Sequence, residues 1–186
     1  RIPTYDRKKL TPRILHIGVG GFHRGHMAVY TDDLLSSGHT DWCIHGVGLT
    51  PSDEAIATVL ENQDYLYTVV TKSTSEEDVR VVGAITNYLY FPNGTAGLCA
   101  HVMEQDYRII SMTVTENGYK YTGNDRHLDF ADAAVAHDVQ NPEDPQSLVG
   151  FLFRVAQLLI QNDRQLPTFM SCDNIPHNGR ILRNLV

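Results

Sequence analysis

A glycine-rich turn directly after an apolar run constrains this chain more than any other feature. Residues 13–19 (RILHIGV) are rich in Ile and Val, follow Pro12 and predict a short buried strand. The turn Gly18-Val19-Gly20-Gly21-Phe22-His23 overlaps the end of that strand, and a helix is predicted over 22–37 with Gly38 as its stop. A strand, a glycine turn and a helix in this order suit a sheet with crossover helices.

Predicted strands and helices alternate along most of the chain, which favours an α/β fold with a parallel sheet and helices on both faces. The runs 65–71 and 79–90 predict either a hairpin or two adjacent strands, and the polar stretch 117–147 predicts a long irregular excursion beside a ligand crevice. The other predicted strands are 42–49, 108–115 and 168–172, and the other predicted helices are 53–62, 95–105 and 145–162, the last starting at Pro145.

The composition narrows the class of partner and compartment. With 15 Lys and Arg against 22 Asp and Glu, the chain has no basic stripe for nucleic acid or an anionic membrane. Its three cysteines form no CxxC pair, and no apolar run has the length of a membrane span, so we expect a cytoplasmic protein. The start at Arg1 and the end inside an apparent helix lead us to expect a piece of a longer protein.

The glycine turn has the chemistry of a phosphate-binding loop. Its first Gly permits a tight turn, and its second lets the backbone approach a pyrophosphate, which then meets the N–H groups at the helix start. The third glycine of the G-x-G-x-x-G pattern is replaced by His23. A purely structural glycine turn is the alternative interpretation.

Asp53 lies just beyond the second predicted strand, where an acidic side chain accepts hydrogen bonds from ribose hydroxyls and repels a 2′-phosphate. No Arg or Lys occurs between Arg24 and Lys72, so NAD is favoured over NADP as the cofactor. The distance from the glycines exceeds the usual spacing of roughly 20 residues. Helix capping by Asp53 is the alternative, and both roles are compatible.

Two further polar segments follow predicted strands. Thr115-Glu116-Asn117-Gly118-Tyr119 comes after 108–115 and could face a nicotinamide or substrate, or form an ordinary Asn-Gly turn. Asn174 follows 168–172, where its amide could donate a hydrogen bond to a reacting oxygen, or Asp173 or Asn174 could simply shape a turn. Among the nine histidines, His23 and His26 have i, i+3 spacing on a helix, but no Cys or carboxylate cluster completes a site, so no metal is expected.

Taken together, these segments resemble the mannitol dehydrogenases, a family of long-chain, metal-independent polyol dehydrogenases. Five blocks carry the resemblance in the family's order and span nearly the whole chain. The blocks are HIGVGGFHRGHMAVYTDDLL (16–35), WCIHGVGLTPSD (42–53), VVGAITNYL (81–89), ISMTVTENGY (110–119) and FMSCDNIPHNG (169–179).

The resemblance implies an N-terminal, Rossmann-like, doubly wound and mostly parallel domain for NAD, incomplete here at its C-terminal end, with a helical C-terminal domain lying outside residues 1–186. Gly18, Gly20, Gly21, Phe22, His23 and Arg24 match the phosphate loop. Asp53 matches the acidic residue that selects NAD, and Asn174 matches an asparagine that polarises the reacting oxygen. Thr115 and Glu116 belong to a block that lines the active site, and only proximity to the cofactor is inferred for Glu116.

The main departure from the family concerns its general base, a lysine in a Lys-x-x-x-x-Asn-x-x-His motif. No Lys occurs after Lys120, so this motif lies outside the chain, and the fragment alone is expected to be inactive. The implied reaction interconverts a polyol and a ketose, with mannitol and fructose as the first pair. The alternatives are a hexuronate reductase acting on fructuronate or tagaturonate, and a non-catalytic dinucleotide-binding module.

Overall fold

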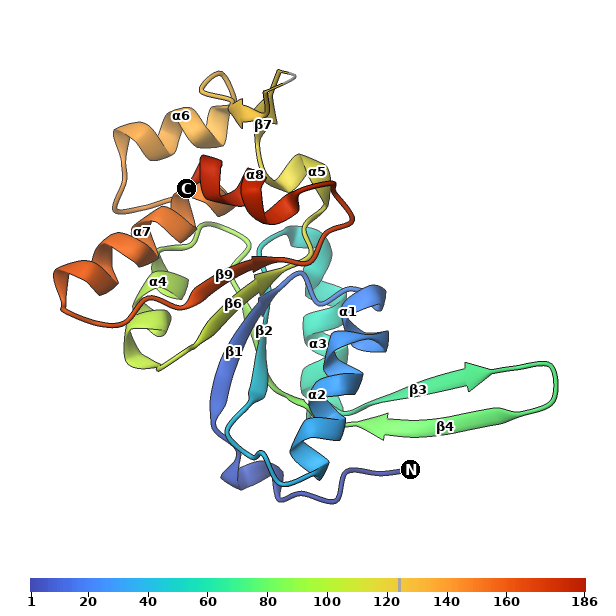
Figure 1. Ribbon diagram of the computed structural model, residues 1–186. Helices are drawn as coiled ribbons and strands as arrows, with labels where there is room; N and C mark the ends of the chain where they lie inside the picture. Colours follow the sequence, from blue (N-terminus) through green and yellow to red (C-terminus); the bar gives the residue numbers. More distant parts are fainter. Residues whose placement is uncertain (124) are drawn as a thin grey trace. The chain divides into compact units, whose positions relative to one another are not determined.

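The computed structural model describes residues 1–123 and 125–186 (Figure 1). The chain divides into two compact units, Arg1–Tyr90 and Phe91–Val186. Within the described residues, no helix combines the length and apolar character that crossing a membrane requires.

Three parallel strands form the centre of the first unit. They are β1 (Pro12–Ile17), β2 (Cys43–Gly48) and β5 (Ile85–Tyr90), in the order β5-β2-β1. The register of the three strands is seen at Val47 of β2, which pairs with Ile17 of β1 on one side and with Leu89 of β5 on the other. Placing the third parallel strand beside the second, and the second beside the first, is the arrangement of a Rossmann half-sheet.

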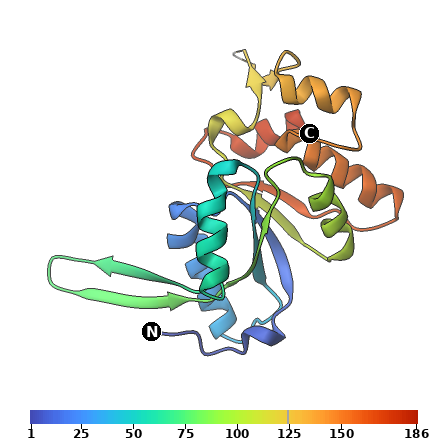
Figure 2. The same cartoon turned by 180° about the vertical axis from the view of Figure 1, so that it is seen from behind.

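The helices of the first unit differ from the prediction at one point. The helix predicted over 22–37 is two helices, α1 (Gly21–Gly25) and α2 (Met27–Ser36), separated by His26 at φ −130° and ψ −88°. Gly25 weakens the helix there, and the His26 ring is held between Phe22, which it stacks on, and Tyr30, which it meets edge-on. The third helix, α3 (Glu54–Asn62), follows a short 3-10 turn and packs against β5, as Figure 2 shows from behind.

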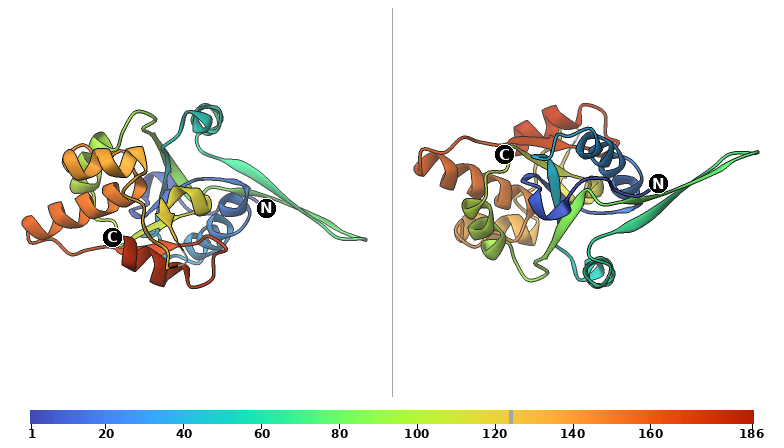
Figure 3. Two further views of the ribbon diagram at one scale, coloured as in Figure 1. Left: turned by 90° about the horizontal axis from the view of Figure 1, so that it is seen from above. Right: turned by 90° about the horizontal axis from the view of Figure 1, so that it is seen from below.

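The prediction of one strand over 79–90 is wrong, because the run contains two strands. β4 (Glu77–Val82) pairs antiparallel with β3 (Tyr67–Lys72), whereas β5 begins at Ile85 and joins the parallel sheet. The break falls at Gly83, where a Cβ atom would lie 2.9 Å from Pro3 and 3.2 Å from Tyr5. The β3–β4 ribbon extends away from the rest of its unit, as both views of Figure 3 show.

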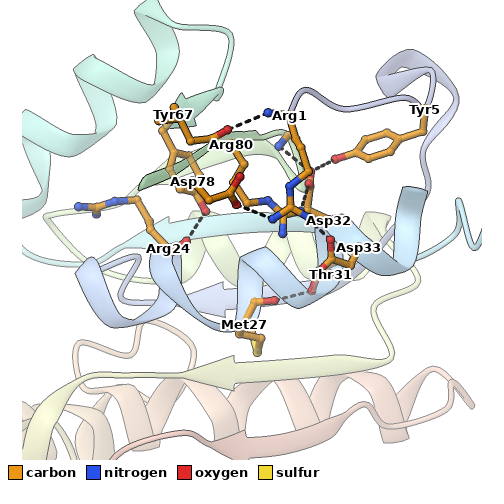
Figure 4. A network of polar contacts seen from close by, with 12 residues as sticks. Arg1, Tyr5, Arg24, Met27, Thr31, Asp32, Asp33, Tyr67, Asp78 and Arg80 are labelled. Atoms are coloured by element: carbon orange, nitrogen blue, oxygen red, sulfur yellow. Dashed lines mark hydrogen bonds and ion pairs between the residues drawn. The ribbon is translucent and has the colours of Figure 1, made fainter. Parts of the chain in front are cut away.

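A buried ion pair ties this ribbon to α2 (Figure 4). Arg80 of β4 donates to Asp32 at 2.6 Å and to Asp33 at 2.8 Å, and the side chains of Arg80 and Asp32 are only 10% and 3% exposed. Asp32 also accepts hydrogen bonds from the Gly83 N–H at 2.9 Å and from the Tyr5 hydroxyl. The Asp32 carboxylate is therefore fully engaged, as a buried charge must be.

The second unit contains another parallel pair, β6 (Ile109–Met112) and β9 (Thr168–Ser171), as predicted from the apolar runs. Its longer helices are α4 (Ala96–Glu104), α6 (Ala133–Gln140), α7 (Leu148–Gln161) and α8 (Asn178–Leu185). Between β6 and α6 lie a single helical turn, α5 (Thr115–Gly118), and the two-stranded pair β7 (Tyr121–Thr122) and β8 (His127–Leu128).

Two boundaries in this unit also differ from the prediction. The stretch 117–147, expected to be irregular, contains β7, β8 and α6; its residue 124 lies outside the described residues. The helix expected to start at Pro145 begins at Leu148, because the Ser147 hydroxyl caps it by accepting from the Gly150 N–H at 2.9 Å. Asp138 of α6 fixes this cap, since its carboxylate accepts from the Ser147 N–H and hydroxyl at 2.9 and 2.5 Å.

Candidate functional site

The glycine turn after β1 closes on itself through backbone contacts. Gly18 has a φ of +86°, which glycine adopts without steric cost, and its carbonyl accepts a hydrogen bond from the Gly20 N–H at 2.8 Å. The Gly18 N–H donates to the Val47 carbonyl of β2 at 3.0 Å, which ties the turn to the neighbouring strand. The first glycine is therefore required by the turn itself.

The next two glycines leave open space. A Cβ atom on Gly21 would meet nothing within 4 Å, and one on Gly20 would meet only the Gly18 carbonyl oxygen at 4.0 Å. Both residues are exposed, and Gly20 is the N-cap of α1 without a side-chain hydrogen bond to the first turn. Packing in the fold does not require glycine at these two positions. The room they leave, beside uncapped helix N–H groups, fits a phosphate group approaching the backbone.

His23, in the place of the usual third glycine, lies beneath the loop and is fully buried. Its ring stacks on His16 of β1 with a centroid separation of 3.5 Å and an interplanar angle of 13°. Burial, followed by the nearby His16 and the positive charge of Arg24, lowers the pKa of His23 to about 2. The His23 side chain is thus a neutral, buried packing group.

The neighbouring residues of the loop have separate environments. Phe22 is 59% exposed and stacks on His26. The Arg24 guanidinium donates to the Val19 carbonyl at 2.7 Å, and the Arg24 carbonyl accepts from the Tyr67 hydroxyl at 2.8 Å. Through these two contacts Arg24 links the glycine loop at Val19 to Tyr67 of β3.

Asp53 lies after β2, at the same edge of the parallel strands as the glycine turn after β1. Its Oδ2 accepts from the N–H groups of Leu49 and Thr50 at 3.1 and 2.9 Å and from the Thr50 hydroxyl at 2.7 Å. Asp53 thus caps the turn that precedes it, while its side chain makes no capping hydrogen bond to α3. Among the described residues, no group donates to Oδ1, so the capping role leaves one carboxylate oxygen available to a ligand.

Sequence reasoning missed the side chain packed beneath Asp53. Tyr88 of β5 lies over the two glycines of β2: a Cβ atom on Gly46 would be 2.9 Å from its ring, and one on Gly48 would be 2.5 Å from its hydroxyl oxygen. The same position on Gly48 is 2.6 Å from the Asp53 Cβ. Two glycines spaced two apart in the predicted strand 42–49 were the available signal, since glycine inside a strand marks a close approach.

In the second unit, Asp173 connects the ends of β6 and β9. Its Oδ1 accepts from the Thr115 N–H at 3.0 Å, and its Oδ2 accepts from the Val114 N–H at 3.1 Å and the Tyr119 hydroxyl at 2.5 Å. The Tyr119 hydroxyl also lies 2.6 Å from the Ser171 hydroxyl. Burial and then the hydrogen bond to Asp173 raise the pKa of Tyr119.

The Asp173 contacts hold a strained backbone. Thr115 has a φ of +62°, which is costly for a β-branched residue, and both it and its predecessor donate to Asp173. Asn174 is exposed, and no hydrogen bond of its side chain occurs among the described residues. Asp173 therefore holds the turn, whereas the Asn174 amide makes no hydrogen bond within the described residues that would stabilise it.

The remaining predicted site residues also lie in this turn. Thr115 and Glu116 are exposed, and the Glu116 carboxylate accepts a hydrogen bond from the Tyr121 hydroxyl. The part of the chain that the structure describes contains no group of three or more His, Cys, Asp or Glu side chains arranged to hold a metal ion.

A glycine turn between the first parallel strand and a helix, with an acid after the second strand, is the arrangement of a Rossmann-type domain. The family model described as the mannitol dehydrogenase Rossmann domain matches residues 12–186, and the chain belongs to that family. Its predicted α/β, Rossmann-like fold class is thereby confirmed.

Individual relatives agree with the family assignment. The chain is 40% identical to the mannitol 2-dehydrogenases of Pyricularia oryzae and Aspergillus oryzae, over 100% of its own length and 38% of theirs. A Pseudomonas fluorescens mannitol 2-dehydrogenase, solved as a ternary complex with NAD and D-mannitol, superposes with a TM-score of 0.93 at 35% identity. A substrate-free D-sorbitol dehydrogenase superposes with a TM-score of 0.91 at 35% identity. Both solved structures are matched over 99% of this chain and 38% of theirs.

Proposed function

We propose that this chain is the cofactor-binding part of an NAD-dependent oxidoreductase that interconverts a polyol and a ketose, with D-mannitol and D-fructose as the pair. The observation that carries the proposal is the open space at Gly20 and Gly21, beside uncapped N–H groups, in a chain of the mannitol dehydrogenase family. The solved relative that holds both NAD and D-mannitol supports this choice of cofactor and substrate.

The loop after β1 would bind the cofactor's pyrophosphate through backbone N–H groups, with Gly20 and Gly21 leaving room for its oxygens. The free oxygen of Asp53 would accept a hydrogen bond from the adenosine ribose, and its charge would repel a 2′-phosphate. Bound in this way, NAD supplies the nicotinamide ring that accepts or returns a hydride. The side chain of His23 stays neutral and buried, so it adds no charge to the phosphate site.

On the substrate side, Asn174 would donate a hydrogen bond from its amide to the oxygen on the reacting carbon. Such a donor is most effective where negative charge develops during the reaction. Its exposure, and the fact that Asp173 rather than Asn174 shapes the turn, support this role. Thr115 and Glu116 would lie near the cofactor, and the general base would come from a lysine outside residues 1–186.

The test is to express the complete reading frame and follow NADH at 340 nm with mannitol and fructose, then with fructuronate and tagaturonate. Polyol oxidation that requires NAD would support the proposal. Turnover restricted to the uronates would replace it with a hexuronate reductase, and NADH binding without turnover of any of the four would favour a binding module.

Two variants of that protein examine the individual roles. Asn174→Ala should lower kcat by roughly 10²–10³-fold, the usual loss for one such donor, and leave the NAD dissociation constant nearly unchanged. Asp53→Ala should reduce the preference for NAD over NADP by about 1–3 kcal/mol, a range that spans ordinary hydrogen bonds and those to a charged group. Normal turnover in the first variant, or an unchanged cofactor ratio in the second, would contradict the assigned role.

We also propose a reduced, cytoplasmic compartment for the protein. Cys43, Cys99 and Cys172 are free thiols, and the first two are buried, which suits an environment that keeps thiols reduced.

A further inference from the structure

The Tyr88 hydroxyl is a buried polar group that forms no hydrogen bond with the described residues of the fold. Its oxygen is buried, and no residue in the described part of the chain gives it a hydrogen-bond partner. Buried hydroxyl groups in proteins are nearly always paired, so each exception calls for a physical explanation.

The strand beneath Tyr88 is shaped to admit its phenol ring. Gly46 and Gly48 of β2 lie on the same face of the strand, because residues two apart in a strand share a face. A Cβ atom on either one would lie within 3 Å of Tyr88, at 2.9 Å from its ring and 2.5 Å from its hydroxyl oxygen. The ring therefore runs along β2 toward the carboxyl end of the strand, the end at which Asp53 follows.

At that end, the hydroxyl of Tyr88 and the side chain of Asp53 border the same small volume. The Cβ position on Gly48 is 2.5 Å from the first and 2.6 Å from the second. The charge of Asp53 also raises the pKa of Tyr88, after the larger effect of burial. On the carboxylate, Oδ2 already accepts three hydrogen bonds, whereas no described residue donates to Oδ1. A hydroxyl without an acceptor thus borders the same volume as the Cβ and Cγ atoms of a side chain whose Oδ1 receives no hydrogen bond from a described residue.

We propose that Tyr88 is a positioning residue for Asp53: its hydroxyl donates to the Asp53 carboxylate when the adenosine ribose of a dinucleotide occupies the site. This inference rests on the proposed function. The hydroxyl oxygen is buried, so Tyr88 would act on a ligand through the neighbouring side chain of Asp53 and not by direct contact. A carboxylate oxygen has two lone pairs, so Oδ1 can accept from Tyr88 and from a ribose hydroxyl together.

The experiment uses the protein expressed from its complete reading frame and measures NADH and NADPH dissociation constants by nicotinamide fluorescence. Four forms are compared: wild type, Tyr88→Phe, Asp53→Ala and the double variant. Tyr88→Phe should raise the NADH dissociation constant about 5- to 10-fold, the size of one ordinary protein hydrogen bond. Because it removes an unpaired buried hydroxyl, it should not lower the melting temperature.

The decisive readout is the coupling between the two residues. Tyr88→Phe should have no further effect on NADH binding when Asp53 is already Ala, since Tyr88 acts through that carboxylate. Tyr90→Phe is the matched control, because it removes a hydroxyl from the same strand that lies 3.5 Å from the Pro51 carbonyl. This control should leave both dissociation constants within twofold of wild type.

Two results would overturn the role of Tyr88 while leaving the proposed function intact. One is an NADH dissociation constant in Tyr88→Phe within twofold of wild type. The other is an equal loss from Tyr88→Phe with and without Asp53, which would mean that the tyrosine does not act through the carboxylate. A wild-type protein that binds neither dinucleotide would overturn the proposed function and this inference together.

Discussion

Replacing Asp173 with Ala should destabilise the turn that joins the ends of β6 and β9. The carboxylate of Asp173 accepts three hydrogen bonds, from the Val114 and Thr115 N–H groups at 3.1 and 3.0 Å and from the Tyr119 hydroxyl at 2.5 Å. Hydrogen bonds to a charged group contribute about 1.5–3 kcal/mol each when they are well protected. Asp173 is only half-buried, so the lower end of that range applies to each of them.

Two features reduce the expected loss of stability further. The Tyr119 hydroxyl keeps its second partner, the Ser171 hydroxyl at 2.6 Å, and the exposed Thr115 N–H can turn to water. Thr115 at φ +62° can also relax once its N–H is released, which returns part of a strain of about 1–3 kcal/mol. The net decrease in the free energy of unfolding for Asp173→Ala should therefore be about 2–3 kcal/mol.

Urea denaturation of wild type, Asp173→Ala and Tyr119→Phe measures this directly. Tyr119→Phe removes one of the three hydrogen bonds to Asp173 and the contact with the Ser171 hydroxyl, but leaves both backbone contacts of Asp173, so its cost should be about 1.5–2 kcal/mol. If Asp173→Ala remained within about 0.5 kcal/mol of wild type, the usual range of a surface substitution, the carboxylate would not hold the turn.

Three further comparisons test the first unit. Asp32→Asn breaks a buried ion pair and should cost about 3–5 kcal/mol in urea denaturation, whereas Asn at the exposed neighbour Asp33 should cost less than about 1 kcal/mol; equal costs would contradict the burial argument. Gly48→Ala should cost about 1–3 kcal/mol by overpacking, whereas Gly25→Ala, with nothing within 4 Å of the new Cβ, should not destabilise the protein at all. In the folded state His23 is neutral, with a pKa of about 2 against an ordinary value of 6.5. Below pH 6.5 the unfolded state therefore binds a proton that the folded state does not. The free energy of unfolding should fall by about 1.4 kcal/mol for each pH unit below 6.5. Thermal denaturation between pH 7.5 and 5 should show that extra loss in wild type but not in His23→Gln, and parallel curves would show that His23 is accessible to protons when folded.

The parts of the fold that the sequence predicts correctly depend on local signals. The apolar run 13–19 is too short for a helix and leads into the glycine turn, and Gly18 adopts the positive φ that the turn requires. The parallel pair β6 and β9 likewise follows from two short apolar runs that are each followed by polar residues. In these cases the determining residues are neighbours in the chain.

The errors arise where distant side chains decide the conformation. The strand predicted over 79–90 breaks at Gly83 because residues from the N-terminal segment and Asp32 occupy the space around that glycine. The start of α7 moves from Pro145 to Leu148 because Asp138, on the preceding helix, fixes the capping Ser147. Neither effect has a signal in the local pattern of apolar and polar residues.

The candidate site shows the same division. The sequence leaves two roles open for Asp53, ribose binding and helix capping; in the structure its Oδ2 caps a turn, and no described residue donates to its Oδ1. For the turn after β9, the sequence could not distinguish Asp173 from Asn174 as the residue that shapes it. The distinction depends on Val114, Thr115 and Tyr119, which lie more than 50 positions earlier in the chain.

Glycines that look alike in the sequence have opposite physical roles in the first unit. Gly20 and Gly21 border open space, so their lack of a side chain contributes nothing to packing and is useful only to something that approaches the backbone. At Gly46 and Gly48, the space that a side chain would occupy is filled by Val19, Tyr88 and Asp53, so the absence of a side chain there serves packing within the fold. The loss of conformational entropy on folding is similar at all four positions. Only the second pair regains it through contacts within the protein, and this difference is the physical ground for proposing that the first pair serves a bound phosphate.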